Sequence, residues 1–169
     1  NLGKQVIKEM NKWGMIIDVS HPSKQSIKDM ISLSKAPIIA SHSSARALCN
    51  HSRNLDDEQL EWMKSNGGVV QTVAFSSYVS SEKHNAYSTA ISKKIENLAN
   101  ERGIEMLSWD QIRKLEATDR EIYVKEYRAM SKEATLMMND SDPKPVDVAD
   151  FVDHIDYLVE KMGLDHVGI

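Results

Sequence analysis

Two histidines stand where their side chains could bind a metal ion. His21 follows a short apolar run at 15–19, and His42 follows the next such run at 37–40. If these runs are neighbouring parallel strands, both imidazoles lie at the carboxyl ends of strands, where α/β proteins carry active sites. Two neutral imidazoles that converge on one point can form part of a zinc site. Loop histidines that hydrogen-bond to backbone would occupy the same positions, so this alternative stays open.

Three further polar residues accompany the histidines. Arg53 could hold a carboxylate through its planar guanidinium, although an exposed ion pair with Asp56 or Asp57 is the simpler interpretation. Tyr78 follows the third apolar run at the same predicted edge, and ordinary packing also explains it. Asp18 lies inside the first run, where it could support a ligand histidine or make a polar contact in the core.

The other candidate groups show no convergent placement. The remaining histidines are interpreted as surface or structural residues: His51, His84, His154 and His166. The single cysteine, Cys49, allows no internal disulfide and has no basic partner at a recognisable spacing. Catalytic zinc sites usually have three or more ligands, and no further cysteine or acidic cluster completes the histidine pair.

The elements that must position these residues alternate between helix and strand. Apolar spacing predicts a helix over 4–13, and a second helix is expected with Pro22 in its first turn. A third helix is expected to be capped by Asn54 and ended by Gly67. Residues 69–75 form the third expected strand. This alternation predicts an α/β fold with a parallel sheet covered by helices.

Residues 79–145 interrupt the alternation and are expected to form a mainly helical insertion. One helix is predicted near 82–101 and another near 119–138. Thr118 and Glu121 have the spacing of a capping box for the second of these helices.

The sheet is expected to resume after the insertion. Asp147 is expected to cap an amphipathic helix that Gly163 ends, and a fourth strand begins at His166. We therefore interpret 1–169 as a single partial domain that contains the insertion.

The composition excludes several classes of protein. The 169 residues are 41% hydrophobic and 27% charged, which is typical of a globular domain. The net charge of −4 offers no basic surface for nucleic acid. No apolar run approaches the roughly 18–20 residues of a membrane span.

Both ends of the sequence predict a longer chain. It begins at Asn1 without a methionine and closes in an apolar run at 166–169 that starts like a strand. A domain rarely ends inside a buried strand. A signal or anchor would precede Asn1, so a cytoplasmic or exported location is left open.

Four motifs, in this order and spacing, resemble the membrane dipeptidase (renal dipeptidase) family of zinc metallopeptidases. They are GMIIDVSH at 14–21, APIIASHSSA at 36–45, SRN at 52–54 and DHVGI at 165–169. The last motif is similar to the start of the family's glycine-rich motif. The resemblance covers most of the chain and is weakest across 79–145.

The resemblance implies part of a (β/α)₈ TIM barrel of the metallo-dependent hydrolase type, about strands five to eight. It implies two zinc ions in the complete protein, with His21 and His42 as metal ligands. Arg53 would bind the substrate carboxylate, with Tyr78 beside it. The family's other ligands have no match here, and no catalytic residue is assigned, since the acid/base aspartate is expected beyond Ile169.

The leading hypothesis is a zinc-dependent dipeptidase that hydrolyses dipeptides to amino acids by a metal-bound hydroxide. The chain by itself is expected to be inactive, because it lacks part of the site. Two alternatives stay open: another metal hydrolase of the amidohydrolase type, and a metal-free structural fragment. The expected partner is a dipeptide, without nucleic acid or a membrane segment, and a homodimer is left open.

Overall fold

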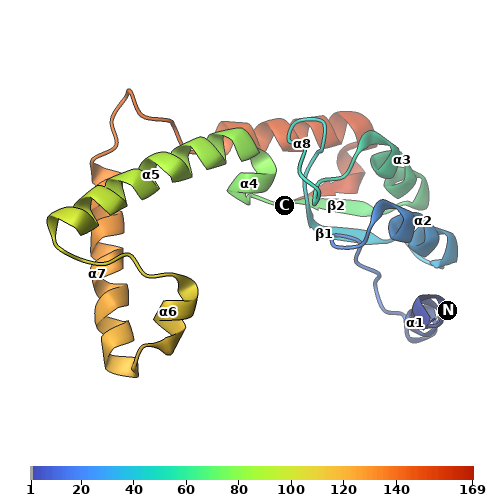
Figure 1. The fold of residues 1–169 in the computed structure, drawn as a ribbon. Helices are drawn as coiled ribbons and strands as arrows, with labels where there is room; N and C mark the ends of the chain where they lie inside the picture. The colour runs from blue at the N-terminus through green and yellow to red at the C-terminus, as the bar shows by residue number, and fades with distance from the viewer. Residues whose placement is uncertain (1) are drawn as a thin grey trace. The chain divides into compact units, whose positions relative to one another are not determined.

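The computed structural model describes residues 2–169, which form two compact units. The first unit contains residues 2–82 and 146–169, and the second contains residues 83–145. All strands of the described chain lie in the first unit (Figure 1).

The first unit is built on a parallel sheet with the strand order β1–β2–β3. Its strands are β1 (Ile39–Ser43), β2 (Val69–Thr72) and β3 (Val167–Gly168). Val70 of β2 is paired with Ala40 on one side and with Val167 on the other. The predicted α/β class with a parallel sheet is therefore confirmed.

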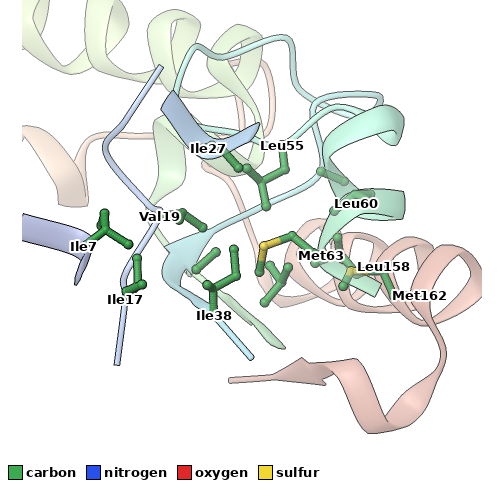
Figure 2. Close-up of a cluster of buried hydrophobic side chains, with 13 residues drawn as sticks. Ile7, Ile17, Val19, Ile27, Ile38, Leu55, Leu60, Met63, Leu158 and Met162 are labelled. Atoms are coloured by element: carbon green, nitrogen blue, oxygen red, sulfur yellow. The ribbon is translucent and has the colours of Figure 1, made fainter. Parts of the chain in front are cut away.

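Helices pack against this sheet through one apolar cluster. The helical elements of the first unit are α1 (Leu2–Trp13), α2 (Lys24–Leu33), α3 (Asp57–Asn66), α4 (Ser76–Val79), α8 (Val148–Met162) and the 3-10 turn η1 (Leu164–His166). Ile27 of α2, Met63 of α3 and Leu158 of α8 are buried in the same cluster (Figure 2). Burial of each such side chain contributes about 1.5–3 kcal/mol, so these contacts hold the helices to the sheet.

Two helix starts differ from the sequence prediction. Asn54 does not cap α3; Asp56 does, in a capping box with Gln59. Pro22 lies outside α2, because Ser23 is the N-cap and its side chain accepts a hydrogen bond from the backbone of the first turn. The Asn54 side chain is unavailable as a cap because buried backbone groups bind it.

The strand ends also differ. Residues 15–19 make a single parallel bridge, between Asp18 and Ile39, in place of the predicted strand. The ladder stops there because neighbouring backbone N–H groups donate to the Asp18 carboxylate instead. His42 lies within β1 rather than after it, and β2 ends at Thr72 because the following residues turn into α4.

The second unit is helical. It contains most of α5 (Ser81–Glu101), together with α6 (Trp109–Lys114) and α7 (Ala117–Leu136). Leu98 of α5 and Met130 of α7 are buried in its own apolar cluster. The helices predicted near 82–101 and 119–138 correspond to α5 and α7, and the interpretation of 1–169 as one domain stays a prediction.

The second unit corrects one prediction and adds one element. The expected capping box of Thr118 and Glu121 is wrong, because α7 begins earlier and Glu116 is its N-cap. The short helix α6 was not predicted, although Ser108 and Gln111 form its capping box. None of the helices described in residues 2–169 is both long and apolar enough to cross a lipid bilayer.

His154 connects α8 to two segments that end near the sheet edge. Its Nδ1 accepts a hydrogen bond from the Ala45 N–H at 3.1 Å, which leaves Nε2–H to donate to the Val79 carbonyl at 2.9 Å. The side chain is buried, and burial lowers the pKa of His154 despite the opposing carboxylates of Asp150 and Asp153. The residue is therefore a structural histidine that is held neutral.

Acidification is expected to destabilise the first unit through His154. The unfolded chain titrates near pH 6.5, above the lowered pKa of the folded protein. As the pH falls below about 6.5, the unfolded state binds the proton more readily, so the free energy of unfolding decreases. The midpoint of urea unfolding should fall between about pH 7.5 and about pH 5.5.

The variant His154→Gln provides the control for this prediction. Its amide can occupy a similar position and does not titrate, so its midpoint should change less over the same range. An equal change in the wild type and the variant would contradict the assignment of the pH dependence to His154.

Candidate functional site

His21 and His42 lie together, as their positions in the sequence predicted. Their Nε2 atoms are 2.9 Å apart, and their ring planes meet at 63°. Two imidazole nitrogens on one tetrahedral zinc ion are about 3.3 Å apart when each Zn–N bond is about 2.0–2.1 Å. The two nitrogens are about 0.4 Å closer than this, so a small movement of either ring would let both bind a single metal ion.

Two histidines do not complete a metal site. Among residues 2–169, no three His, Cys, Asp or Glu side chains gather in an arrangement that could hold a metal ion. Catalytic zinc sites have three protein ligands and an open position for water. The described residues can thus supply only part of a coordination shell.

The Asp18 carboxylate joins the two segments that carry these histidines. Its Oδ1 accepts hydrogen bonds from the N–H and Oγ of Ser20, at 3.0 and 2.9 Å, and from the Ser41 N–H at 3.1 Å. Its Oδ2 accepts a short hydrogen bond from Ser41 Oγ. Burial alone would raise the pKa of Asp18, but the hydrogen bonds from Ser41 and Ser20 outweigh it and lower the pKa to about 2. The group is therefore an anion at neutral pH.

Both serines extend these contacts to His42. The His42 N–H donates to Ser20 Oγ at 2.9 Å, and Ser41 Oγ lies 2.7 Å from His42 Nδ1. Of the two roles considered for Asp18, the structure thus shows an indirect link to a candidate metal ligand. The carboxylate reaches the imidazole through one hydroxyl.

Arg53 lies beside the histidine pair. Its Nε donates to the Ser20 carbonyl at 3.1 Å, and its Nη2 lies 3.1 Å from His42 Nε2. The guanidinium carbon lies 5.6 Å from the centre of the Tyr78 ring, within the range of a cation–π contact. The structure therefore brings all four predicted site residues into one cluster.

The carboxylates considered as partners for Arg53 bind other cations. Asp56 pairs with Lys24 at 2.8 Å and with Arg46 at 3.7 Å. Asp57 pairs with Lys161 at 3.4 Å. Among residues 2–169, Arg53 therefore contacts Ser20, His42 and Tyr78 and does not form the simple surface ion pair with Asp56 or Asp57.

Tyr78 belongs to α4, and its ring stacks on His51 with centroids 4.4 Å apart. His51 Nδ1 also accepts a hydrogen bond from the Arg53 N–H at 3.2 Å. His51 was predicted to be a surface or structural residue, but the structure places it in the wall of the site. Its proximity to Arg53 in a short loop was the only available signal.

Asn54 fixes the loop that presents Arg53. Its buried amide donates to the carbonyls of Cys49 and Tyr78 at 2.9 and 2.7 Å, and its oxygen accepts from the Ser44 N–H at 3.2 Å. One side chain thereby joins the end of β1, the Arg53 loop and α4. Sequence reasoning assigned it to a helix cap because asparagine is common in both situations.

The arrangement has a defined chemical capacity. Two imidazole nitrogens can donate electron pairs to a cation, while the adjacent guanidinium can bind an anion in its fork. A metal ion and a carboxylate-bearing ligand could therefore be held side by side.

Replacement of Asn54 by alanine is expected to destabilise the first unit by about 2–4 kcal/mol, because three buried backbone groups lose their partner. Chemical unfolding would measure the change. Asn100→Ala, at an exposed position of α5, is the matched control and should have little effect. A change below about 1 kcal/mol for Asn54→Ala would show that water replaces the amide.

Comparisons with known proteins show that this chain is similar to dipeptidases. The family model described as Membrane dipeptidase (Peptidase family M19) matches residues 1–169. Dipeptidase aclJ of Aspergillus oryzae is 40% identical over 88 residues, which are 52% of this chain and 21% of that protein.

Solved structures of dipeptidases are also similar to this chain. The probable dipeptidase PvdM from Pseudomonas aeruginosa superposes with a TM-score of 0.62 and 34% identity, covering 99% of this chain and 41% of PvdM. Dipeptidase AC, a metallopeptidase of family M19, gives a TM-score of 0.59 at 20% identity over 99% of this chain and 32% of its own, and shows similarity of fold alone. This chain thus spans between about a fifth and two fifths of the length of these relatives.

Proposed function

Because this chain belongs to the membrane dipeptidase family, peptidase family M19, we propose that it supplies part of the active site of a zinc-dependent dipeptidase. The complete protein would hydrolyse a dipeptide to its two amino acids. One observation carries the proposal: the Nε2 atoms of His21 and His42 approach to 2.9 Å beside the Arg53 guanidinium.

The proposed fold is part of a (β/α)₈ barrel. The segment 15–19 and strands β1, β2 and β3 would be consecutive barrel strands, about the fifth to the eighth. Their parallel order and the superposition on PvdM support this assignment. The helical unit at 83–145 would then be an insertion between two barrel strands.

His21 and His42 would hold one zinc ion through Nε2. Bound zinc polarises a carbonyl group and lowers the pKa of a bound water towards about 7. The described residues offer only two converging ligands. Other parts of the complete protein would therefore supply the remaining ligands, including those of a second zinc ion, and the acid/base aspartate.

Arg53 would bind the C-terminal carboxylate of the dipeptide. The Ser20 carbonyl and the Tyr78 ring fix the guanidinium, so its fork is oriented before substrate arrives. Consecutive carbonyl carbons of a peptide are less than about 4 Å apart. A carboxylate held beside the metal ligands therefore places the last peptide bond, and no more distant one, next to the metal.

Loss of either histidine is expected to reduce zinc binding and activity together. In the complete protein, His21→Ala and His42→Ala should each lower the zinc content measured by atomic absorption and reduce kcat/KM for a dipeptide by at least about a hundredfold. The matched control is His84→Ala, in the second unit, which should keep both.

Two results would contradict this proposal. One is full zinc content in either histidine variant. The other is turnover of a dipeptide by the 169-residue chain alone with added zinc, because two ligands should not support catalysis.

Replacement of Arg53 by methionine is expected to raise KM for dipeptides by about 10–100-fold, the equivalent of a lost charged hydrogen bond of about 1.5–3 kcal/mol. A substrate with an amidated C-terminus should show little change, because it lacks the carboxylate. The control is Arg113→Met, at an exposed position of α6. Equal effects on both substrates would favour another metal hydrolase of the amidohydrolase type.

A further inference from the structure

We infer that Asp18 and Ser41 are positioning residues that keep the proton of His42 on Nδ1 and leave Nε2 free to bind the metal. The inference rests on the proposed function, because it concerns a proposed ligand of that site. Ser41 contacts the ring at Nδ1, and Asp18 contacts Ser41, so both act through His42.

Ser41 lies between the Asp18 carboxylate and the His42 ring. Its hydroxyl has one proton, and Asp18 Oδ2 is an acceptor without a proton of its own to offer. The short contact between them therefore uses the Ser41 proton. Ser41 Oγ can then only accept towards His42 Nδ1, 2.7 Å away, so the imidazole proton must be on Nδ1.

The opposite side of the His42 ring faces Arg53. Arg53 Nη2 lies 3.1 Å from His42 Nε2, and a guanidinium has donors but no acceptor. His42 Nε2 must therefore present a lone pair. This contact involves neither Asp18 nor Ser41, yet it requires the same tautomer.

The carboxylate also fixes the geometry around the ring. Three donors from Ser20 and Ser41 hold Asp18 Oδ1, so Oδ2 has a defined direction towards the Ser41 hydroxyl. Metal-binding histidines usually donate their second N–H to a group that orients the ring and makes it a stronger ligand. Here a serine held by a carboxylate takes that place.

The order of protons predicts a different tautomer population for each of two variants. Ser41→Ala removes the acceptor at Nδ1, so the apo protein should show a mixture of His42 tautomers in which only the Arg53 contact still favours the Nδ1–H form. In Asp18→Asn, the three donors keep the amide oxygen at the Oδ1 position, which places the amide N–H₂ at Ser41. The amide then donates to Ser41, Ser41 donates to His42 Nδ1, and the imidazole proton moves to Nε2.

The test uses the complete protein and two readouts besides activity. Imidazole ¹⁵N spectra of the metal-free protein give the tautomer of His42, and competition with a chelator gives the affinity for zinc alone. We expect about 10–100-fold weaker zinc binding in Ser41→Ala and in Asp18→Asn. Ser41→Thr, which keeps the hydroxyl, should restore both readouts. Ser65→Ala, on the exposed side of α3, is the matched control.

The outcomes separate this inference from the proposed function. An unchanged His42 tautomer in Ser41→Ala and Asp18→Asn would overturn the inference, even if zinc affinity fell, because the effect would then be structural. The same holds if the tautomer changes but zinc affinity does not. If His42→Ala leaves zinc affinity at the wild-type value, the proposed function fails, and the spectra still report whether Asp18 controls the imidazole proton.

Discussion

The parallel direction of the strands is the constraint from which the site follows. Segment 15–19, β1 and β2 all run the same way, so residues that end them meet at one edge of the sheet. His21 and His42 are 21 positions apart in the chain, with α2 between them as the crossover. Since parallel strands require such crossovers, functional residues from separate parts of the sequence meet at the carboxyl edge of the sheet.

Two polar side chains then replace the regular ladder at that edge. Asp18 collects donors from both histidine-bearing segments, and Asn54 binds the loops on the other side of Arg53. Both groups have several partners, although only Asn54 is buried and Asp18 is exposed. Asp18 joins its own segment to β1 through Ser41, and Asn54 joins its loop to the end of β1 and to α4, so the positions of the histidines and the arginine are coupled through the backbone.

The sequence predicts the site better than it predicts the boundaries of the elements. The apolar runs before His21 and His42 were sufficient to place both side chains at one edge, and the family motifs added Arg53 and Tyr78. Asn54 was assigned wrongly, since its partners come from segments that only the tertiary structure brings near. The short helices α4 and α6 were missed because four to six residues carry too little periodicity to distinguish a helix from a turn.

The first unit is discontinuous in sequence, and this has a consequence for folding. Val167 of β3 joins Val70 of β2 only after roughly 100 intervening residues, a closure that costs conformational entropy. The second unit is made of sequence-local helices with a core of its own, contacts of the kind that form quickly. During synthesis the second unit can fold before β3 has been made and has joined the sheet. The segment between β2 and β3 is then a compact unit and no longer a long flexible loop. When β3 emerges from the ribosome, it can pair with the edge of β2 that has been unpaired until then.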